Sequence, residues 1–124
     1  MDVIRTDCLV IGSGLAGSAY ALQVAEAGLK VQLLSMNGPT GANSDWAQGG
    51  IIYETDTDSG LLARDIMEAS DHTANPAAIE QLVREGPRAV RELLIEQAGV
   101  AFDRDQDGKL EFTREGGHSA RRII

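Results

Sequence analysis

The stretch DCLVIGSGLAG, residues 7–17, decides the fold that this sequence predicts. Its apolar run stops at glycines, which is typical of a buried strand. Helix-forming residues follow as far as Ala27, and Gly28 is placed to end that helix. Apolar and β-branched residues return from Lys30 to Ser35. A strand, a helix and a strand within about 30 residues predict a parallel crossover unit over residues 7–35, and therefore an α/β fold.

The glycines of this stretch have the spacing Gly-x-Gly-x-x-Gly, which predicts a nucleotide site between strand and helix. Gly12 allows a tight turn, Gly14 lets a pyrophosphate approach the backbone, and Gly17 lets the helix pack closely on the strand. Amides at the helix N-terminus would face the phosphates, which the helix dipole attracts. The alternative is a turn that serves only packing. The predicted cofactor-binding residues are Gly12, Ser13, Gly14, Leu15, Ala16 and Gly17.

The end of the second strand bears on which nucleotide binds. A dinucleotide fold usually has Asp or Glu there, about 20 residues after the glycines, to hold the adenosine ribose. This chain has Ser35 and Met36 instead. A serine hydroxyl can bond a ribose hydroxyl, but it lacks the charge and the bidentate grip of a carboxylate. Both residues are candidate cofactor contacts, and the case for NAD is weakened.

Length and composition exclude several classes of protein. The chain has 124 residues, which is one domain or part of one, and its 43% hydrophobic and 24% charged residues are typical of globular proteins. A net charge of -8 would repel a nucleic-acid backbone, so no nucleic-acid partner is expected. The one cysteine, Cys8, can form neither an internal disulfide nor a four-thiolate metal site. No apolar run is long enough to span a membrane, and we expect a reducing, cytoplasmic location.

The middle of the chain predicts a loop followed by helices. Residues 36–51 contain several glycines and almost no apolar period, which indicates a long loop, and a short strand is predicted at residues 51–53. Apolar periodicity predicts helices over residues 59–98. Asn75 followed by proline has the form of a helix cap. Gly86-Pro87 predicts a kink or a division into two helices.

A hairpin is predicted over residues 100–113. Pairing Phe102 with Leu110 and Val100 with Phe112 would place four apolar side chains on one face. An Asp-Gly pair lies in the turn between them, as in many hairpins.

The acidic tip of this hairpin has a second interpretation. Asp103, Asp105, Asp107 and Gly108 match the first half of an EF-hand loop. Arg114 stands where a bidentate glutamate is required. A calcium-binding acidic module is therefore the alternative to an ordinary acidic turn, and we predict no metal site.

Three segments together resemble a known family. They are residues 12–17, residues 43–51 (NSDWAQGGI) and residues 113–123 (TREGGHSARRI). In order and spacing they are similar to the N-terminal part of the L-aspartate oxidases, which belong with the succinate dehydrogenase and fumarate reductase flavoproteins. The resemblance covers nearly all 124 residues. It implies a Rossmann-like FAD-binding domain, of which residues 1–124 form the N-terminal portion only.

The resemblance implies FAD as the cofactor, with residues 36–51 as the flavin loop. Backbone without side chains at Gly49 and Gly50 can approach a flat ring and point amides at its heteroatoms. In relatives that hold flavin covalently, a histidine lies four positions before the Ala-Gln-Gly-Gly run, and here that position is Asn43. FAD is therefore expected to be noncovalent. The implied contacts in this loop are Asn43, Ser44, Ala47, Gln48, Gly49 and Gly50.

The third segment bears on the substrate. The resemblance places an apolar aromatic residue before the Gly-Gly pair in relatives that use simple dicarboxylates, whereas this chain has Glu115. A carboxylate facing the α-ammonium of aspartate would favour aspartate and repel a simple diacid. His118 and Ser119 would border the same site, and a role in fixing the loop after Gly117 is the alternative for both. The family's catalytic base lies downstream of Ile124, so no catalytic residue is expected in this chain.

The resemblance implies oxidation of L-aspartate to iminoaspartate, the first step of quinolinate and NAD biosynthesis. Oxygen or fumarate would accept the electrons, and quinolinate synthase is the implied partner for the product. We expect the 124 residues alone to lack turnover, because a binding turn without its base cannot promote the proton transfer. The alternative enzyme is a related dicarboxylate flavoprotein similar to fumarate reductase.

Overall fold

The computed structural model of the protein describes residues 3–53 and 59–124. The chain divides into two compact units, residues 1–49 and residues 50–124. The division falls inside the loop expected at the flavin. Each unit has buried apolar residues of its own, which are Val10 in the first unit and Leu62, Ile79, Val90 and Ile123 in the second.

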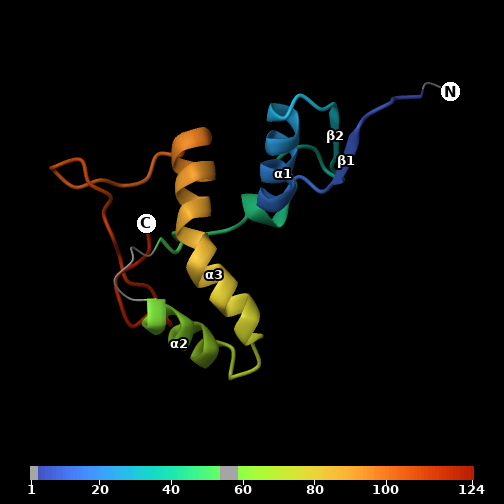
Figure 1. Ribbon diagram of the computed structural model, residues 1–124. Helices are drawn as coiled ribbons and strands as arrows, with labels where there is room; N and C mark the ends of the chain where they lie inside the picture. Colours follow the sequence, from blue (N-terminus) through green and yellow to red (C-terminus); the bar gives the residue numbers. More distant parts are fainter. Residues whose placement is uncertain (1–2, 54–58) are drawn as a thin grey trace. The chain divides into compact units, whose positions relative to one another are not determined.

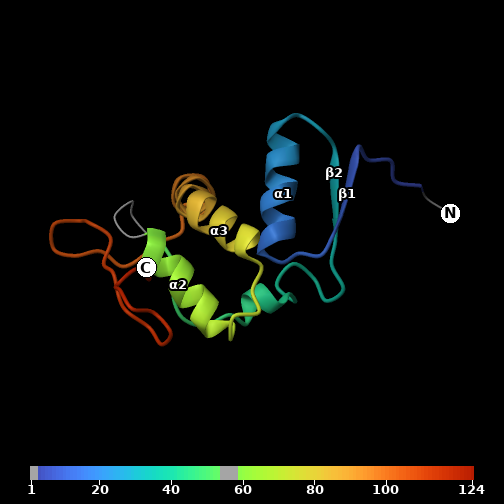
Figure 2. The same ribbon diagram turned by 60° about the horizontal axis from the view of Figure 1, so that its bottom comes forward.

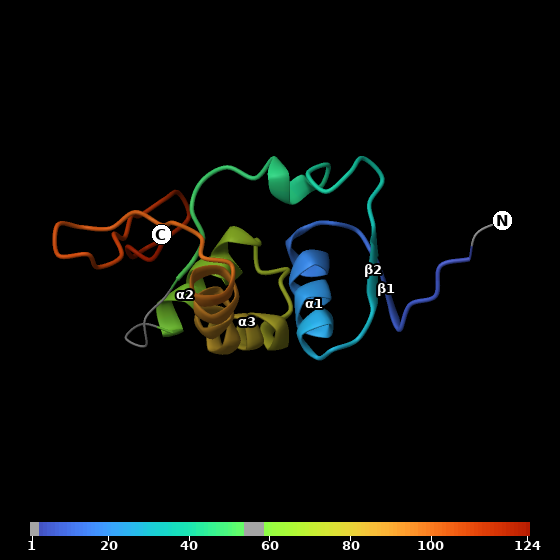
Figure 3. The same cartoon turned by 90° about the horizontal axis from the view of Figure 1, so that it is seen from above.

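The first unit contains the strand, helix and strand that the sequence predicts. β1 (Cys8–Ile11) and β2 (Val31–Leu34) pair in parallel. α1 (Leu15–Glu26) connects them and contacts both, and Figure 3 shows it on one side of the strand pair. Because the strands are parallel, their carboxyl ends meet at one edge, where the glycine turn leaves β1. The prediction of an α/β fold is confirmed.

The prediction of a buried first strand is wrong for half of its side chains. Val10 is 9% exposed, whereas Leu9 is 52% and Ile11 is 82% exposed. Successive side chains of a strand point to opposite faces. Since α1 packs on one face of this sheet, the side chains on that face are covered and those on the other are not.

α2 (Ser59–Ala69) and α3 (Pro76–Ala89) lie side by side in the second unit, as Figure 2 shows. Asn75 caps α3 in the way that the sequence predicts. Its side-chain oxygen accepts the Ala77 N–H at 2.9 Å, and proline takes the first helical position. The start of α3 is therefore determined by local chemistry.

The break predicted at Gly86-Pro87 is a change of helix type. α3 runs through Pro87 and continues directly into η2 (Val90–Gln97), which is a π-helix. Figure 1 shows the yellow and orange parts of this helical stretch pointing in different directions. Proline has no N–H to donate, and its ring crowds the carbonyl four positions earlier. The wider π-helical turns follow immediately after this disturbance.

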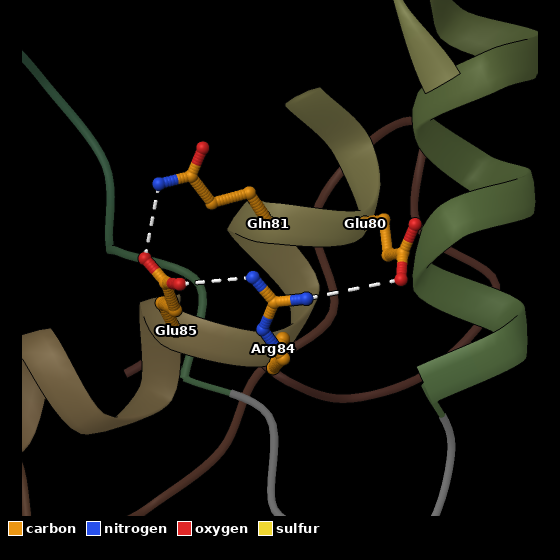
Figure 4. Close-up of polar contacts among 4 residues, drawn as sticks. All are labelled: Glu80, Gln81, Arg84 and Glu85. Atoms are coloured by element: carbon orange, nitrogen blue, oxygen red, sulfur yellow. Dashed lines mark hydrogen bonds and ion pairs between the residues drawn. The ribbon is translucent and has the colours of Figure 1, made fainter. Parts of the chain in front are cut away.

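The exposed face of α3 carries a small polar network, drawn in Figure 4. Arg84 Nη2 donates to Glu85 Oε1 at 3.0 Å, and Arg84 Nη1 lies 3.8 Å from Glu80 Oε1. Gln81 Nε2 donates to Glu85 Oε2 at 3.0 Å. These bonds, with that from Gln81 the largest cause, lower the pKa of the Glu85 carboxyl. Exposed networks of this kind contribute little to stability.

The hairpin predicted over residues 100–113 forms only at its tip, and the predicted register is wrong. Leu110 pairs with Arg104 rather than with Phe102. Asp105 explains this register, because its carboxylate accepts two backbone N–H groups of the turn, both at 2.9 Å. A side chain that bonds its own turn can override the pairing that apolar side chains would favour.

The backbone near Ile52, Thr113 and Ile123 comes together at Ile123, which is 3% exposed. Ile123 pairs antiparallel with Ile52 and with Thr113. Backbone hydrogen bonds between Ile51 and Ile124, at 2.9 and 3.1 Å, extend the first of these bridges. The short strand predicted at residues 51–53 is therefore a single bridge, and it brings the end of the loop to the third segment of the resemblance.

Candidate functional site

The glycine turn has an open outer side and a closely packed inner side. Gly12 has a φ of +110°, which favours glycine, and its N–H donates to the Leu34 carbonyl at 2.8 Å. A Cβ at Gly12 would meet nothing within 4 Å. A Cβ at Gly17 would collide with the Gly12 carbonyl oxygen and lie 3.4 Å from Val10 Cγ1. Gly17 therefore lets α1 approach β1.

The N-terminus of α1 is capped from the loop rather than from the turn. Its N-cap residue is Gly14, which has no side chain that could accept a hydrogen bond from the helix amides. The Leu15 N–H donates instead to Ser44 Oγ at 3.0 Å, and Ser44 belongs to the 3-10 turn η1 (Asn43–Asp45). A hydroxyl oxygen therefore accepts one of the amides that the sequence assigns to a phosphate. The first two segments of the resemblance meet at this contact.

The serine at the end of β2 also lies beside the glycine turn. Ser13 Oγ donates to Ser35 Oγ at 2.9 Å, and the Ser35 hydroxyl donates to the Gly38 carbonyl. Ser18 Oγ donates to the Ser13 carbonyl at 3.2 Å. These bonds place Ser13 and Ser35 together at the carboxyl edge of the strands. Met36, the next residue, is 92% exposed and contributes no polar group.

The remaining loop residues of the first unit are exposed. The side chains concerned are those of Asn43, Ala47 and Gln48, and Gly49 is exposed as well. Trp46, in the same loop, is 79% exposed. The 3-10 turn is held by the Trp46 N–H, which donates to the Asn43 carbonyl at 3.1 Å. The polar and aromatic side chains of this loop are therefore exposed rather than packed in a core.

The second unit brings Glu115 to the end of the flavin loop. The Gly50 N–H donates to Glu115 Oε1 at 3.2 Å. A Cβ at Gly50 would overlap the Ile123 side chain and lie 2.5 Å from the Ile124 carbonyl oxygen, so this position requires glycine. The predicted flavin contact and the predicted specificity residue are in direct contact.

A buried ion pair lies beside this segment. Arg122 Nη1 donates to Asp65 Oδ2 at 2.7 Å, and the side chains are 2% and 11% exposed. The same oxygen accepts the Ser119 N–H at 2.8 Å and the Ser119 hydroxyl at 2.9 Å. The Ser119 N–H is the largest cause of a lowered pKa of the Asp65 carboxyl; the hydroxyl and the guanidinium act in the same direction, and burial opposes them.

His118 closes the turn that begins at Glu115. Its N–H donates to the Glu115 carbonyl at 3.3 Å, and Gly117 between them has a φ of +82°. Nδ1 of His118 is buried and has no hydrogen-bond partner within residues 3–53 and 59–124. The Ser119 hydroxyl, in contrast, is bonded to Asp65. The Ser119 hydroxyl therefore joins the segment after Gly117 to α2.

The sequence interpretation misses Asp65 and Arg122. A signal for Asp65 exists, since it lies three positions after Leu62 and four before Ala69, on the face of α2 that carries the apolar side chains. A charge on such a face indicates a buried partner. Nothing local identifies that partner as Arg122, which is 57 residues away.

Two kinds of site are absent from the described parts of the chain. No group of three or more His, Cys, Asp or Glu side chains in residues 3–53 and 59–124 could hold a metal ion. Within the same residues, no helix combines the length and the apolar character that crossing a membrane needs.

The sequence of this chain is similar to the sequences of known proteins. Residues 7–124 match the family model described as FAD binding domain. The chain is 41% identical to an L-aspartate oxidase of Halobacterium salinarum, in an alignment that covers 99% of this chain and 24% of that protein. It is 42% identical to L-aspartate oxidase 2 of Ralstonia nicotianae, in an alignment that covers 97% of this chain and 22% of that protein. The chain thus spans about a quarter of the length of these relatives.

A solved structure supports the fold. The E. coli quinol fumarate reductase FrdA superposes with a TM-score of 0.86, over 99% of this chain and 21% of that one. The two sequences are 23% identical, so this likeness concerns the fold alone. It agrees with the Rossmann-like FAD-binding fold that the resemblance implies.

Proposed function

Because this chain belongs to the family of FAD binding domains, we propose that it is the N-terminal part of a FAD-dependent L-aspartate oxidase. The hydrogen bond between Gly50 and Glu115 carries this proposal. It joins the end of the flavin loop to the one carboxylate that distinguishes the third segment from those of simple dicarboxylate flavoproteins. Relatives about 40% identical that are named L-aspartate oxidases support the same assignment.

FAD is the cofactor of this family, and the glycine turn is the site that we assign to its diphosphate. The turn has no side chain at Gly12 or Gly14, beside the positive end of α1; the space at Gly12 is open, whereas a Cβ at Gly14 would lie 3.4 Å from Ser44 Oγ. Ser44 Oγ lies where a second acceptor can share the helix amides with a phosphate oxygen. Ser35 is the candidate for the ribose. The amide of Asn43 has no nucleophilic nitrogen, which supports noncovalent binding.

Glu115 is the residue that we assign to substrate recognition. One carboxylate oxygen, Oε1, accepts the Gly50 N–H, and the side chain is exposed. Oε2 can then accept a hydrogen bond from the α-ammonium of aspartate. A carboxylate paired with an ammonium makes a charge-assisted bond, whereas the same carboxylate repels a diacid that lacks the ammonium.

The chemistry that FAD supplies is removal of a hydride from the substrate α-carbon, which, with loss of a proton from the ammonium, leaves iminoaspartate. The part of the protein described here binds and orients: the turn holds the cofactor and Glu115 fixes the ammonium. Oxygen or fumarate is the proposed electron acceptor, and a quinolinate synthase the proposed consumer of the product. The single cysteine supports a reducing compartment, which we take to be the cytoplasm.

Substitution of Glu115 by glutamine tests the proposal. Glutamine keeps an oxygen for the Gly50 N–H and removes the charge. In the complete FAD-loaded protein, the ratio of the Kd for succinate to the Kd for L-aspartate should fall about tenfold. Titrations with succinate followed by flavin absorbance measure the first constant, and the dependence of the flavin reduction rate on L-aspartate concentration, in rapid mixing without oxygen, measures the second. Glu111→Gln, an exposed change in the same unit, should leave the ratio unchanged, and an unchanged ratio in Glu115→Gln would contradict the role of Glu115.

Calorimetry separates the remaining alternatives. The oxidase requires FAD binding and a preference for aspartate over succinate. A protein that binds FAD but prefers succinate or fumarate would be the related dicarboxylate flavoprotein. Heat on adding calcium, with none on adding FAD, would identify the acidic tip at residues 103–108 as a cation site instead.

A further inference from the structure

The side chain of Asp65 accepts three hydrogen bonds from another segment of the chain. It lies on α2 and is 11% exposed. A single oxygen, Oδ2, accepts three hydrogen bonds of 2.7 to 2.9 Å, two from Ser119 and one from Arg122. All three donors come from the segment that directly follows Glu115. Asp65 therefore connects a helix to the segment that carries the specificity residue.

The turn that begins at Glu115 is held at both ends. At its start, Glu115 Oε1 accepts the Gly50 N–H at 3.2 Å. At its end, Ser119 gives both its N–H and its hydroxyl to Asp65. Between these points the chain contains two glycines, which by themselves restrict the backbone least. The two outside contacts therefore add to the hydrogen bond from the His118 N–H to the Glu115 carbonyl in fixing the turn.

The ion pair is poorly suited to a purely stabilising role. Arg122 is 2% exposed, yet its Nε and Nη2 have no hydrogen-bond partner within residues 3–53 and 59–124. Unpaired buried donors cost free energy, and buried ion pairs are often no more stable than apolar packing. An ion pair can instead be useful because it holds the chain in one conformation, whatever its net contribution to the free energy of unfolding.

We propose that Asp65 is a positioning residue for substrate recognition: by holding Ser119 and Arg122, it presents the Glu115 carboxylate to the substrate ammonium. This inference rests on the proposed function, since it concerns the same substrate site. Asp65 itself does not touch the substrate. Its effect on recognition is exerted through the turn at residues 115–119.

The same two affinity measurements on the complete FAD-loaded protein test the inference. Asp65→Asn keeps the size of the side chain and weakens all three hydrogen bonds, and Ser119→Ala removes one of them. The ratio of the Kd for succinate to the Kd for L-aspartate should fall about tenfold in Asp65→Asn and by a smaller factor in Ser119→Ala. Glu68→Gln, an exposed change on the same helix, is the matched control and should keep the ratio.

Hydrogen exchange gives a readout that loss of stability alone would not produce. The Gly50 N–H is bonded to Glu115, whereas the neighbouring Ile51 N–H is bonded to the Ile124 carbonyl. In Asp65→Asn, the Gly50 amide should exchange faster while the Ile51 amide keeps its rate. Equal acceleration of both amides would show general destabilisation and would overturn the inference.

The outcomes separate the two proposals. A wild-type protein without preference for aspartate removes the proposed function, and the inference falls with it. A wild-type preference that survives unchanged in Asp65→Asn overturns the inference and leaves the proposed function standing. If Asp65→Asn does not fold, Ser119→Ala decides by the same two measurements.

Discussion

Asp65 and Glu115 both carry a carboxylate, but their surroundings give the two groups different roles. Asp65 accepts three hydrogen bonds and is 11% exposed, so its charge is committed to the protein. Glu115 accepts one bond, from a backbone amide, and is exposed, so its second oxygen remains available. The number of donors around each carboxylate, rather than its chemistry, decides which of them can meet a ligand.

The lowered pKa of Asp65 predicts a dependence of stability on pH. The folded carboxyl binds its proton more weakly than the unfolded one, so its contribution is fully present above the ordinary pKa of about 3.9 and is lost as the pH falls below it. The free energy of unfolding of Asp65→Asn should therefore differ most from the wild type near pH 7, and the difference should narrow below about pH 4. Urea titrations at both pH values measure this; a constant difference would contradict the assignment.

At the scale of elements, the turn that follows α2 contains local strain. Asp71 and His72 have φ angles of +50° and +58°, a conformation that favours glycine. The His72 N–H donates to the Met67 carbonyl at 2.9 Å, which holds the chain in this conformation. Asn75 can then begin α3. The strain is the consequence of turning the chain sharply between two packed helices.

This strain predicts the response to substitution at His72. His72→Val places a β-branched side chain in the left-handed region and should lower the free energy of unfolding by about 1–2 kcal/mol. His72→Asn, which tolerates that region, serves as the control and should be close to neutral. Thermal unfolding of the two variants measures the difference. Equal stability of both would show that the turn relaxes.

The elements also differ in how far the sequence predicts them. The cap of α3 and the end of β1 are predicted correctly, because adjacent residues supply the hydrogen bonds and conformations that define them. The hairpin register is predicted wrongly, since the Asp105 side chain competes with apolar pairing through bonds to its own turn. Apolar patterning does not contain that competition.

For the whole molecule, the division into two units predicts independent local opening. Gly17 packs so closely on Gly12 that a larger side chain must move the helix. Gly17→Val should therefore accelerate amide exchange in β1, α1 and β2, about tenfold or more, and leave α2 and α3 unchanged. Gly60→Ala, where a Cβ meets nothing within 4 Å, is the control. Faster exchange in residues 59–97 of Gly17→Val would show that the units open together.

The sequence by itself determined features that are defined by neighbouring residues or by short motifs. These are the strand-helix-strand unit, the glycine turn, the helix cap and the three segments that resemble the family. These depend on neighbouring residues, whose spacing can be read directly. Only the tertiary structure joined Gly50 to Glu115 and Asp65 to Arg122, pairs that are 65 and 57 residues apart. Such contacts depend on the path of the whole chain, and no local period records which distant donor will meet a given acceptor.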